Sequence, residues 1–230
     1  MKRVVGTLML VFFGTIASFA QDSPQSTPEF KRNKQVFEMA SLFNDAAVAR
    51  TALYNMIAID SKNPALLDSL ALLYYEFQNY SSAAIVTQAA LRANPSNPLM
   101  LELSAICYES LGLPDRALAQ YETLYMKQNN PLTLYKMAFL QLQVKHYVEV
   151  NTSADILLAK PELKETKIVF PKEDETTQEV SMHAALYNLK GLAAKAQGDN
   201  VGAKAMFDKA LEVSPDFEIA LKNAQEAASK

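Results

Sequence analysis

The small and hydrophobic positions of this chain recur with a period of about 34 residues. Pro64 and Pro98 lie 34 residues apart, and Pro131 follows 33 residues later. A second series keeps the same spacing and consists of Ala49, Ala83, Ala117 and Val150. A period of this length is typical of helix–turn–helix units that bury their apolar faces only against a neighbouring copy. The pattern therefore predicts a stack of helix pairs, which usually presents an extended binding surface.

The clearest copy of the repeat spans residues 64–97 and reads PALLDSLALLYYEFQNYSSAAIVTQAALRANPSN. It resembles the tetratricopeptide repeat (TPR), and its matches to that family's pattern are Leu67, Leu70, Ala71, Tyr74, Tyr80, Ala83, Ala90 and Pro95. Small residues at these places let paired helices approach closely, and aromatic residues fill the seam between repeats. The proline ends a helix that it cannot continue.

The other copies match the family pattern to different degrees. Residues 184–217 match nearly as well, with Lys190 in place of the usual Leu. Residues 98–130, 131–164 and 30–63 match at fewer positions. Atypical terminal copies are expected, because they must tolerate water on one side.

The resemblance implies an all-α fold, a right-handed superhelical solenoid of about five TPR-like repeats within residues 30–230. The last segment, residues 216–229 (DFEIALKNAQEAAS), has helical period, with Phe217, Leu221 and Ala224 on one face. We expect this segment to form a capping helix that covers the apolar face left open by the last repeat.

One interruption breaks the period. Val150 and Ala203 are 53 residues apart, which is 34 plus 19, and the extra length falls at residues 165–183. Apolar residues alternate with polar ones at Ile168 and Phe170, and again at Val180 and Met182, on either side of a charged stretch. This alternation predicts a short β-hairpin with one apolar face.

The hairpin has two interpretations, as a loop packed on the outside of the solenoid or as an element that lies over the groove and regulates or extends binding. Pro171 limits its strand to an edge or strand-end role. The acidic cluster Glu173–Glu175 predicts a solvated turn rather than a cation site, because two lysines lie nearby and EF-hand spacing is absent.

The N-terminal residues 1–20 have the three regions of a secretory signal peptide. Lys2–Arg3 is a charged start, Val4–Ile16 is mainly apolar, and Ser18–Ala20 offers small residues before a cleavage point. The alternative is an uncleaved membrane anchor, but the apolar run is shorter than the roughly 20 residues of a comfortable span. We expect an exported protein, periplasmic or secreted, with residues 21–29 as a flexible leader.

Charge and cysteine content narrow the range of partners. The formal net charge is 22 − 25 = −3, and it becomes 20 − 25 = −5 once Lys2 and Arg3 are removed. We therefore expect no binding to nucleic acid. No stretch after residue 20 is long and apolar enough to cross a bilayer, so we also expect no membrane span after signal cleavage. Cys107 is the only cysteine, so it forms no intramolecular disulfide. It lies far from the cleavage point, which argues against lipidation, and its helical context predicts a buried small side chain.

Signals for catalysis are weak. The sequence contains two histidines, His146 and His183, and lacks HExxH, paired CxxC, P-loop and GxSxG motifs. We therefore expect no catalytic residue, no metal site and no cofactor. An enzyme with an unrecognised site stays open as an alternative.

The resemblance places a binding groove on the first helix of each repeat. The groove residues that it implies are Asp68, Leu72, Tyr75, Glu102, Ile106, Glu109, Tyr135, Phe139 and Leu142, with Ala185, Asn188 and Leu192 at corresponding positions of the last repeat. The basic residues with which chaperone-binding relatives clamp a C-terminal carboxylate are not at these positions. What remains is an apolar stripe edged by carboxylates, either a partner site or ordinary core.

These features predict a non-enzymatic scaffold or adaptor of the cell envelope that binds a protein or peptide partner in the groove. The ligand that we expect in this groove is a helix or an extended peptide with apolar anchors, with basic flanks as an option opposite the carboxylates. The alternative is a structural, self-associating envelope protein whose groove is closed by its own hairpin. The sequence identifies neither the partner nor the oligomeric state.

Overall fold

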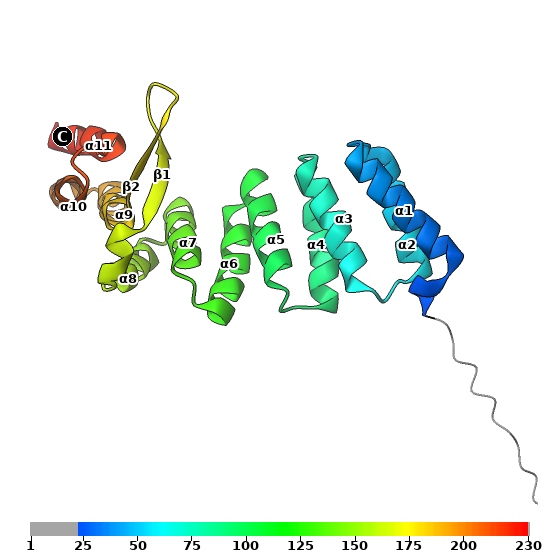
Figure 1. Ribbon diagram of the computed structural model, residues 1–230. Coiled ribbons are helices and arrows are strands. Elements are labelled where there is room, and N and C mark those ends of the chain that lie inside the picture. The colour runs from blue at the N-terminus through cyan, green and yellow to red at the C-terminus, as the bar shows by residue number, and fades with distance from the viewer. Residues whose placement is uncertain (1–22, 230) are drawn as a thin grey trace, which may run out of the picture.

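The computed structural model describes residues 23–229, which form a row of helix pairs with one small sheet (Figure 1). The predicted signal peptide, residues 1–20, lies outside the described residues. The helices are α1 (Pro28–Leu42), α2 (Ala46–Ile59), α3 (Pro64–Glu76), α4 (Tyr80–Ala93), α5 (Pro98–Ser110), α6 (Pro114–Gln128), α7 (Pro131–Gln143), α8 (Tyr147–Leu158), α9 (Met182–Ala196), α10 (Asn200–Val213) and α11 (Glu218–Ala228). The all-α solenoid expected from the 34-residue period is confirmed.

The recurrent prolines mark the starts of first helices. Pro64, Pro98 and Pro131 each occupy the first turn of their helix, where the missing N–H costs nothing. An asparagine precedes each proline as the N-cap; Asn97, for example, accepts hydrogen bonds from Leu99 N at 3.1 Å and Met100 N at 3.4 Å. The Asn–Pro pair thus satisfies the helix terminus and sets its position in the sequence.

The turn inside each helix pair repeats as a backbone conformation. A left-handed residue follows each first helix, and these residues are Asn44, Gln78, Gly112, Lys145 and Gly198. This is the usual way to terminate an α-helix, and glycine adopts the conformation without steric cost. The spacing of the left-handed residues matches the sequence period, so the repeat is visible in the chain path as well as in the residues.

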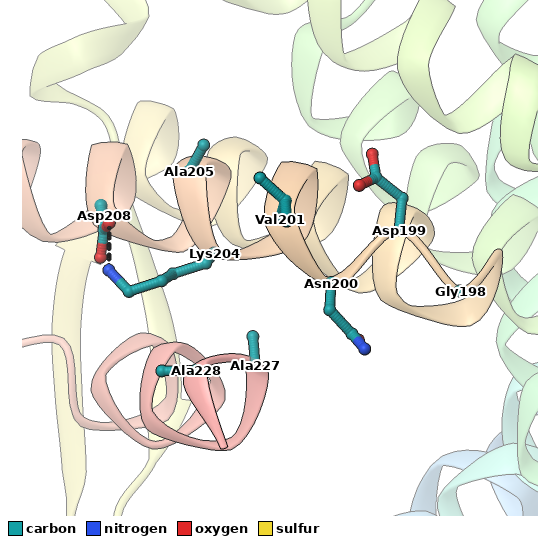
Figure 2. Close-up of a pocket in the computed structure, with 9 residues that line it drawn as sticks. All are labelled: Gly198, Asp199, Asn200, Val201, Lys204, Ala205, Asp208, Ala227 and Ala228. Atoms are coloured by element: carbon teal, nitrogen blue, oxygen red, sulfur yellow. Dashed lines mark hydrogen bonds and ion pairs between the residues drawn. The ribbon is translucent and has the colours of Figure 1, made fainter. Parts of the chain in front are cut away.

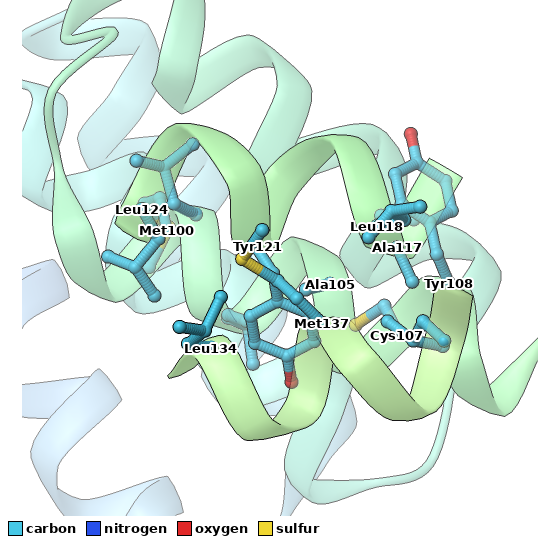
Figure 3. Close-up of a cluster of buried hydrophobic side chains, with 14 of the residues drawn as sticks. Met100, Ala105, Cys107, Tyr108, Ala117, Leu118, Tyr121, Leu124, Leu134 and Met137 are labelled. Atoms are coloured by element: carbon cyan, nitrogen blue, oxygen red, sulfur yellow. The ribbon is translucent and has the colours of Figure 1, made fainter. Parts of the chain in front are cut away.

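Paired helices meet through small residues that have no exposed surface. In the regular repeats these include Ala71, Ala83, Ala105, Ala117, Ala138 and Val150. Larger side chains fill the seams between pairs; Tyr121 of α6 is 1% exposed and lies among Met100, Leu134 and Met137 (Figure 3). The core is therefore a continuous seam along the row, divided into local clusters of neighbouring helices.

The interruption in the period folds as η2 (Pro161–Glu165) followed by a two-stranded antiparallel hairpin, β1 (Lys167–Pro171) and β2 (Thr177–Ser181). The predicted hairpin is confirmed, and Ile168 and Phe170 lie on its partly buried face with Val180. Met182 differs from the prediction, because it begins α9 rather than extending β2. Ser181 accounts for this switch, since its Oγ caps α9 by accepting from His183 N at 3.2 Å.

The two ends of the solenoid differ in detail from the sequence-based expectation. Residues 24–29, assigned to a flexible leader, contain η1 (Pro24–Ser26) and the start of α1, whose N-cap Thr27 accepts from Phe30 N at 3.2 Å. At the other end, α11 buries Ala220, Ala224 and Ala227, whereas Leu221 is 47% exposed. Within residues 23–229, no helix is long and apolar enough to cross a membrane.

Candidate functional site: the first-helix surface and the hairpin pocket

The sequence-predicted groove residues form one surface along α3, α5 and α7. Asp68, Leu72 and Tyr75 lie on α3, Glu102, Ile106 and Glu109 on α5, and Tyr135, Phe139 and Leu142 on α7. All nine are half-buried or exposed, and Phe139 is the most exposed of the apolar ones at 44%. The surface is therefore accessible in part.

The three carboxylates of this surface are already engaged within the chain. Asp68 Oδ2 accepts a hydrogen bond from Asn97 Nδ2 at 2.8 Å. Glu102 pairs with Lys136 Nζ at 2.9 Å. These two contacts connect neighbouring repeats. Glu109 is engaged within one repeat, where it accepts a hydrogen bond from the Tyr121 hydroxyl at 2.9 Å. The carboxylates therefore contribute to the solenoid first, and they offer a ligand less charge than the sequence implies.

Asp68 is the least satisfied of these groups. Its Oδ1 is buried and has no hydrogen-bond partner among the described residues. Burial raises the pKa of this carboxyl above its usual range, and the Asn97 hydrogen bond opposes that shift only in part. The charged form of Asp68 is therefore less favourable in the folded chain than in water.

A cavity of about 440 Å³, which we call the hairpin pocket, lies where the hairpin meets the first helices. Its walls come from α7, β1, α9 and α11, and its residues include Tyr135, Phe139, Val169, Asn188, Leu192 and Ile219. Its size falls within the range of ligand-binding cavities. Two of the nine predicted groove residues thus meet three counterparts of the last repeat, Ala185, Asn188 and Leu192, around one cavity.

The lining of the hairpin pocket is apolar and uncharged. Its polar side chains are Tyr135 and Asn188. Asn188 Oδ1 already accepts from Asn223 Nδ2 at 2.9 Å. Burial raises the pKa of Tyr135 to about 12, so its hydroxyl stays protonated at neutral pH. No hydrogen bond of that hydroxyl is found among the described residues, which leaves it as a donor for an incoming group.

The hairpin wall is held in place from the α11 side. Phe170 packs on Phe217 with ring centroids 4.8 Å apart. Ser181 N donates to Ser214 Oγ at 3.3 Å. The Gln178 amide, oriented to satisfy both neighbours, donates to the Asp216 carbonyl and accepts from Glu218 N, each at 3.1 Å. β2 is therefore fixed to the start of α11, and β1 faces the pocket.

Two further depressions lie at the ends of the solenoid. One, of about 820 Å³, lies between α10 and α11, where Lys204 pairs with Asp208 at 2.6 Å (Figure 2). The other, of about 430 Å³, lies on α1 and α2 beside Met39 and Phe43, which are 54% and 72% exposed. Both are the outer faces of terminal helices, and neither contains a predicted groove residue.

The cysteine and the two histidines, which are the residues with the greatest potential for chemistry, are buried in the core or lie at helix ends. Cys107 is fully buried, and burial raises the pKa of its thiol to about 11, which disfavours the reactive thiolate. His146 is the exposed N-cap of α8, and His183 Nε2 lies 3.1 Å from the Lys160 carbonyl. Within residues 23–229, no cluster of three His, Cys, Asp or Glu side chains is arranged to hold a metal ion.

Sequence reasoning missed part of the hairpin pocket. Alternation in the sequence indicated the apolar face of Ile168 and Phe170, but it carried no signal for the helices on which that face packs. Val169 and Ile219 were also missed, since each is a single apolar residue outside the repeat pattern. Only the meeting of α7, α9 and α11 with the hairpin makes them part of one site.

Comparisons with known proteins identify the fold. No family model matches the sequence, and no curated protein matches it significantly. Among solved structures, the chain is similar to YrrB, described as a TPR protein with an unusual peptide-binding site. The TM-score is 0.65 at 16% identity, over 89% of this chain and 94% of YrrB.

Two other solved structures agree. A tetratricopeptide repeat protein from Parabacteroides merdae gives a TM-score of 0.64 at 18% identity, over 88% of this chain and 73% of that protein. MamA gives a TM-score of 0.61 at 12% identity, over 81% of this chain and 92% of MamA. The helix pairs, their left-handed turns and these likenesses lead to one conclusion: the chain has the fold of a TPR-like repeat protein.

Proposed function

We propose that this protein is a non-enzymatic scaffold or adaptor of the cell envelope that binds a segment of a partner protein on its first-helix surface. The observation that carries the proposal is the hairpin pocket, an uncharged cavity beside the exposed ring of Phe139. Proteins usually bind their ligands in cavities that are mostly apolar and contain a few polar groups. YrrB, whose fold is similar, is described as having a peptide-binding site, which supports the same use of this fold.

The proposal is tested by photocrosslinking in cells. A photoreactive phenylalanine analogue at Phe139 is expected to form an adduct with one partner protein. The same analogue at Ile85, an apolar residue that is 71% exposed on α4, is the matched control and should give no such adduct. Equal crosslinking at both positions, or none at Phe139, would contradict binding on the first-helix surface.

Export is the second part of the proposal, and it is supported by the signal-peptide pattern of residues 1–20. Cell fractionation should find the protein outside the cytoplasm, and N-terminal sequencing should begin at Gln21. A protein that keeps Met1 and sediments with membranes would support the anchor instead.

A second candidate function is self-association with a closed groove, and one observation favours it. The hairpin already covers part of the first-helix surface, where Ile168 and Tyr135 pack against the same cluster of buried residues. Light scattering of the purified protein distinguishes the two functions. A discrete oligomer that yields no crosslinked partner would favour self-association.

A further inference from the structure

The hairpin has one strand edge whose backbone groups are unpaired. Lys172 N donates to the Thr176 carbonyl at 2.8 Å, and Met182 N donates to the Thr166 carbonyl at 2.8 Å. With the register Val169↔Glu179, these bonds place the hydrogen-bonded pairs at even-numbered residues of β1. Ile168 and Phe170 therefore bond to β2.

The odd-numbered residues of β1 point their backbone groups the other way. Because ladder bonds alternate along an antiparallel strand, the N–H and C=O groups of Lys167 and Val169 face away from β2. No hydrogen bond to these four groups is found among the described residues. Pro171 follows at the next outward position, where its lack of an N–H removes no ladder bond and ends the edge.

This edge opens on the hairpin pocket. Val169 and Pro171 line the pocket together with Tyr135 and Phe139 of α7. In Figure 1, β1 lies on the α7 side of the hairpin and β2 on the α11 side. The outer edge of β2 is occupied in part, because Ser181 N donates to Ser214 Oγ. Proteins usually protect an exposed edge by shortening it or by placing lysine or proline on it. β1 is five residues long with Lys167 and Pro171 at its ends, so its unpaired groups are confined to a short stretch beside the cavity.

We propose that β1 binds an extended peptide as a third strand, with an uncharged apolar side chain of that peptide in the hairpin pocket. The proposal rests on the proposed function and specifies the form of its ligand. Strand addition takes its affinity from main-chain hydrogen bonds and its specificity from pockets for alternate side chains. Lys167 and Val169 supply two donors and two acceptors, and the pocket supplies the site for one side chain.

The chemistry of the pocket defines the anchor residue. No charged side chain lines it, so a charged anchor would lose its hydration without gaining a partner. Asn188 already bonds to Asn223, which leaves the Tyr135 hydroxyl as the free polar group of the lining. A leucine, phenylalanine or methionine fits these conditions, with a backbone carbonyl placed to accept from Tyr135.

The position of the edge favours a peptide over a second copy of the chain. The free edge of β1 runs along the uncharged pocket, and Val169 is 59% exposed there. A peptide can place an apolar side chain in the pocket, whereas β1 of a second copy would bring the charged Lys167 beside a lining that offers it no partner. Pairing of β1 with β1 of another copy is therefore an outcome that the test must exclude.

The test uses peptides selected from a phage-displayed library of random linear sequences against the purified protein. Val169→Pro removes the outward N–H and leaves the ladder to β2 intact, since that N–H does not bond to β2. It should weaken a selected peptide by about tenfold, the effect of one lost hydrogen bond. Glu179→Pro, at the paired position of β2, is the matched control and should leave affinity unchanged.

A second measurement does not depend on the fold of a proline variant. N-methylation of the peptide, one residue at a time, should weaken binding at every second position, because only alternate N–H groups face β1. Amide hydrogen exchange at Val169 in the unaltered protein should slow when the peptide binds.

The outcomes separate this proposal from the proposed function. Peptides that bind and are weakened by Phe139→Ala, but show helical periodicity or no effect of Val169→Pro, would keep the groove and overturn strand addition. If Phe139→Ala weakens the binding of none of the selected peptides, both proposals are overturned. Concentration-dependent dimerisation abolished by Val169→Pro would assign the edge to a second copy and also overturn the peptide.

Discussion

The two halves of the first-helix surface are built from corresponding helices of different repeats, but they offer different sites. Along α3 and α5 the surface is a plain row of side chains, and its carboxylates bond within the solenoid. Beyond α7 the hairpin adds a wall, and the surface becomes a cavity with a free strand edge. The comparison teaches that a TPR-like row supplies a platform, while the insertion that breaks its period creates a defined pocket.

The largest effect is expected from removing the side chain that holds the hairpin. Phe217 is fully buried and packs on Phe170, so Phe217→Ala should destabilise the protein by about 3–5 kcal/mol. Chemical denaturation measures the loss, and hydrogen exchange should show the hairpin and α11 opening before α3 and α5. Phe43→Ala, at a 72% exposed ring, is the control, with an expected change within about 0.5 kcal/mol. Uniform loss of protection along the chain would contradict the division into two halves.

A smaller effect tests how closely the last helix pair packs. Gly191 occupies the place that Ala71 and Ala105 hold in regular repeats, and a Cβ there would overlap the ring of Phe207. Gly191→Ala should therefore cost about 1–3 kcal/mol through overpacking, although alanine is the better helix former. Ala105→Gly, its counterpart, should cost about 1–2 kcal/mol, because the lower helix propensity of glycine adds to the loss of a buried methyl group. Thermal melting compares the two, and a stabilising Gly191→Ala would show that the last pair accepts regular spacing.

Substitutions in the two halves of the first-helix surface should differ in their effect on peptide affinity. Phe139→Ala removes one wall of the hairpin pocket and should weaken a selected peptide about tenfold, which corresponds to about 1.4 kcal/mol. Ile106→Ala, on the unwalled part of the surface, should change affinity by less than twofold. Because Phe139 is 44% exposed, its truncation should leave melting nearly unchanged. Equal losses at both positions would mean that the whole surface binds as one groove.

The smallest expected effect is a pH dependence that belongs to the unwalled half. Burial raises the pKa of Asp68 above its ordinary value of 3.8, so the folded chain binds this proton more tightly than the unfolded chain does. The stability contributed by this group is therefore fully present below the unfolded-state pKa of 3.8, and it is lost as the pH rises through the folded-state pKa. Asp68→Asn should remove that component from melting curves measured at neutral and mildly acidic pH. An unchanged pH profile would show that Oδ1 is solvated.

Much of the fold could be predicted because its signals are local. The prolines of the first helices, the small residues of the helix pairs and the alternation around residues 167–181 each act over a few residues. The errors were also local in cause. The start of α1 at Pro28 depends on a cap by Thr27, and the start of α9 at Met182 depends on a cap by Ser181. In both cases one side-chain hydrogen bond decided between two plausible conformations.

The candidate site was less predictable, because it depends on contacts between distant segments. The groove positions on α3, α5 and α7 followed from the repeat, but their role as a binding site stays a prediction. The sequence implied an acidic edge at Asp68 and Glu102, whereas the structure pairs both residues with neighbours about one repeat away. The hairpin pocket needs α7 and α11, which lie far apart along the chain, to meet around β1.

The sequence by itself determined the helix pairs, their period, the place of the interruption and the tendency of that interruption to form a hairpin. Helix caps, prolines and hydrophobic periodicity act within a few residues, so they are legible without a structure. Only the tertiary structure decided that the hairpin packs on the first helices and turns the free edge of β1 towards α7. That choice depends on which apolar faces meet, above all Phe170 and Phe217, and such pairings are set by packing across the whole row.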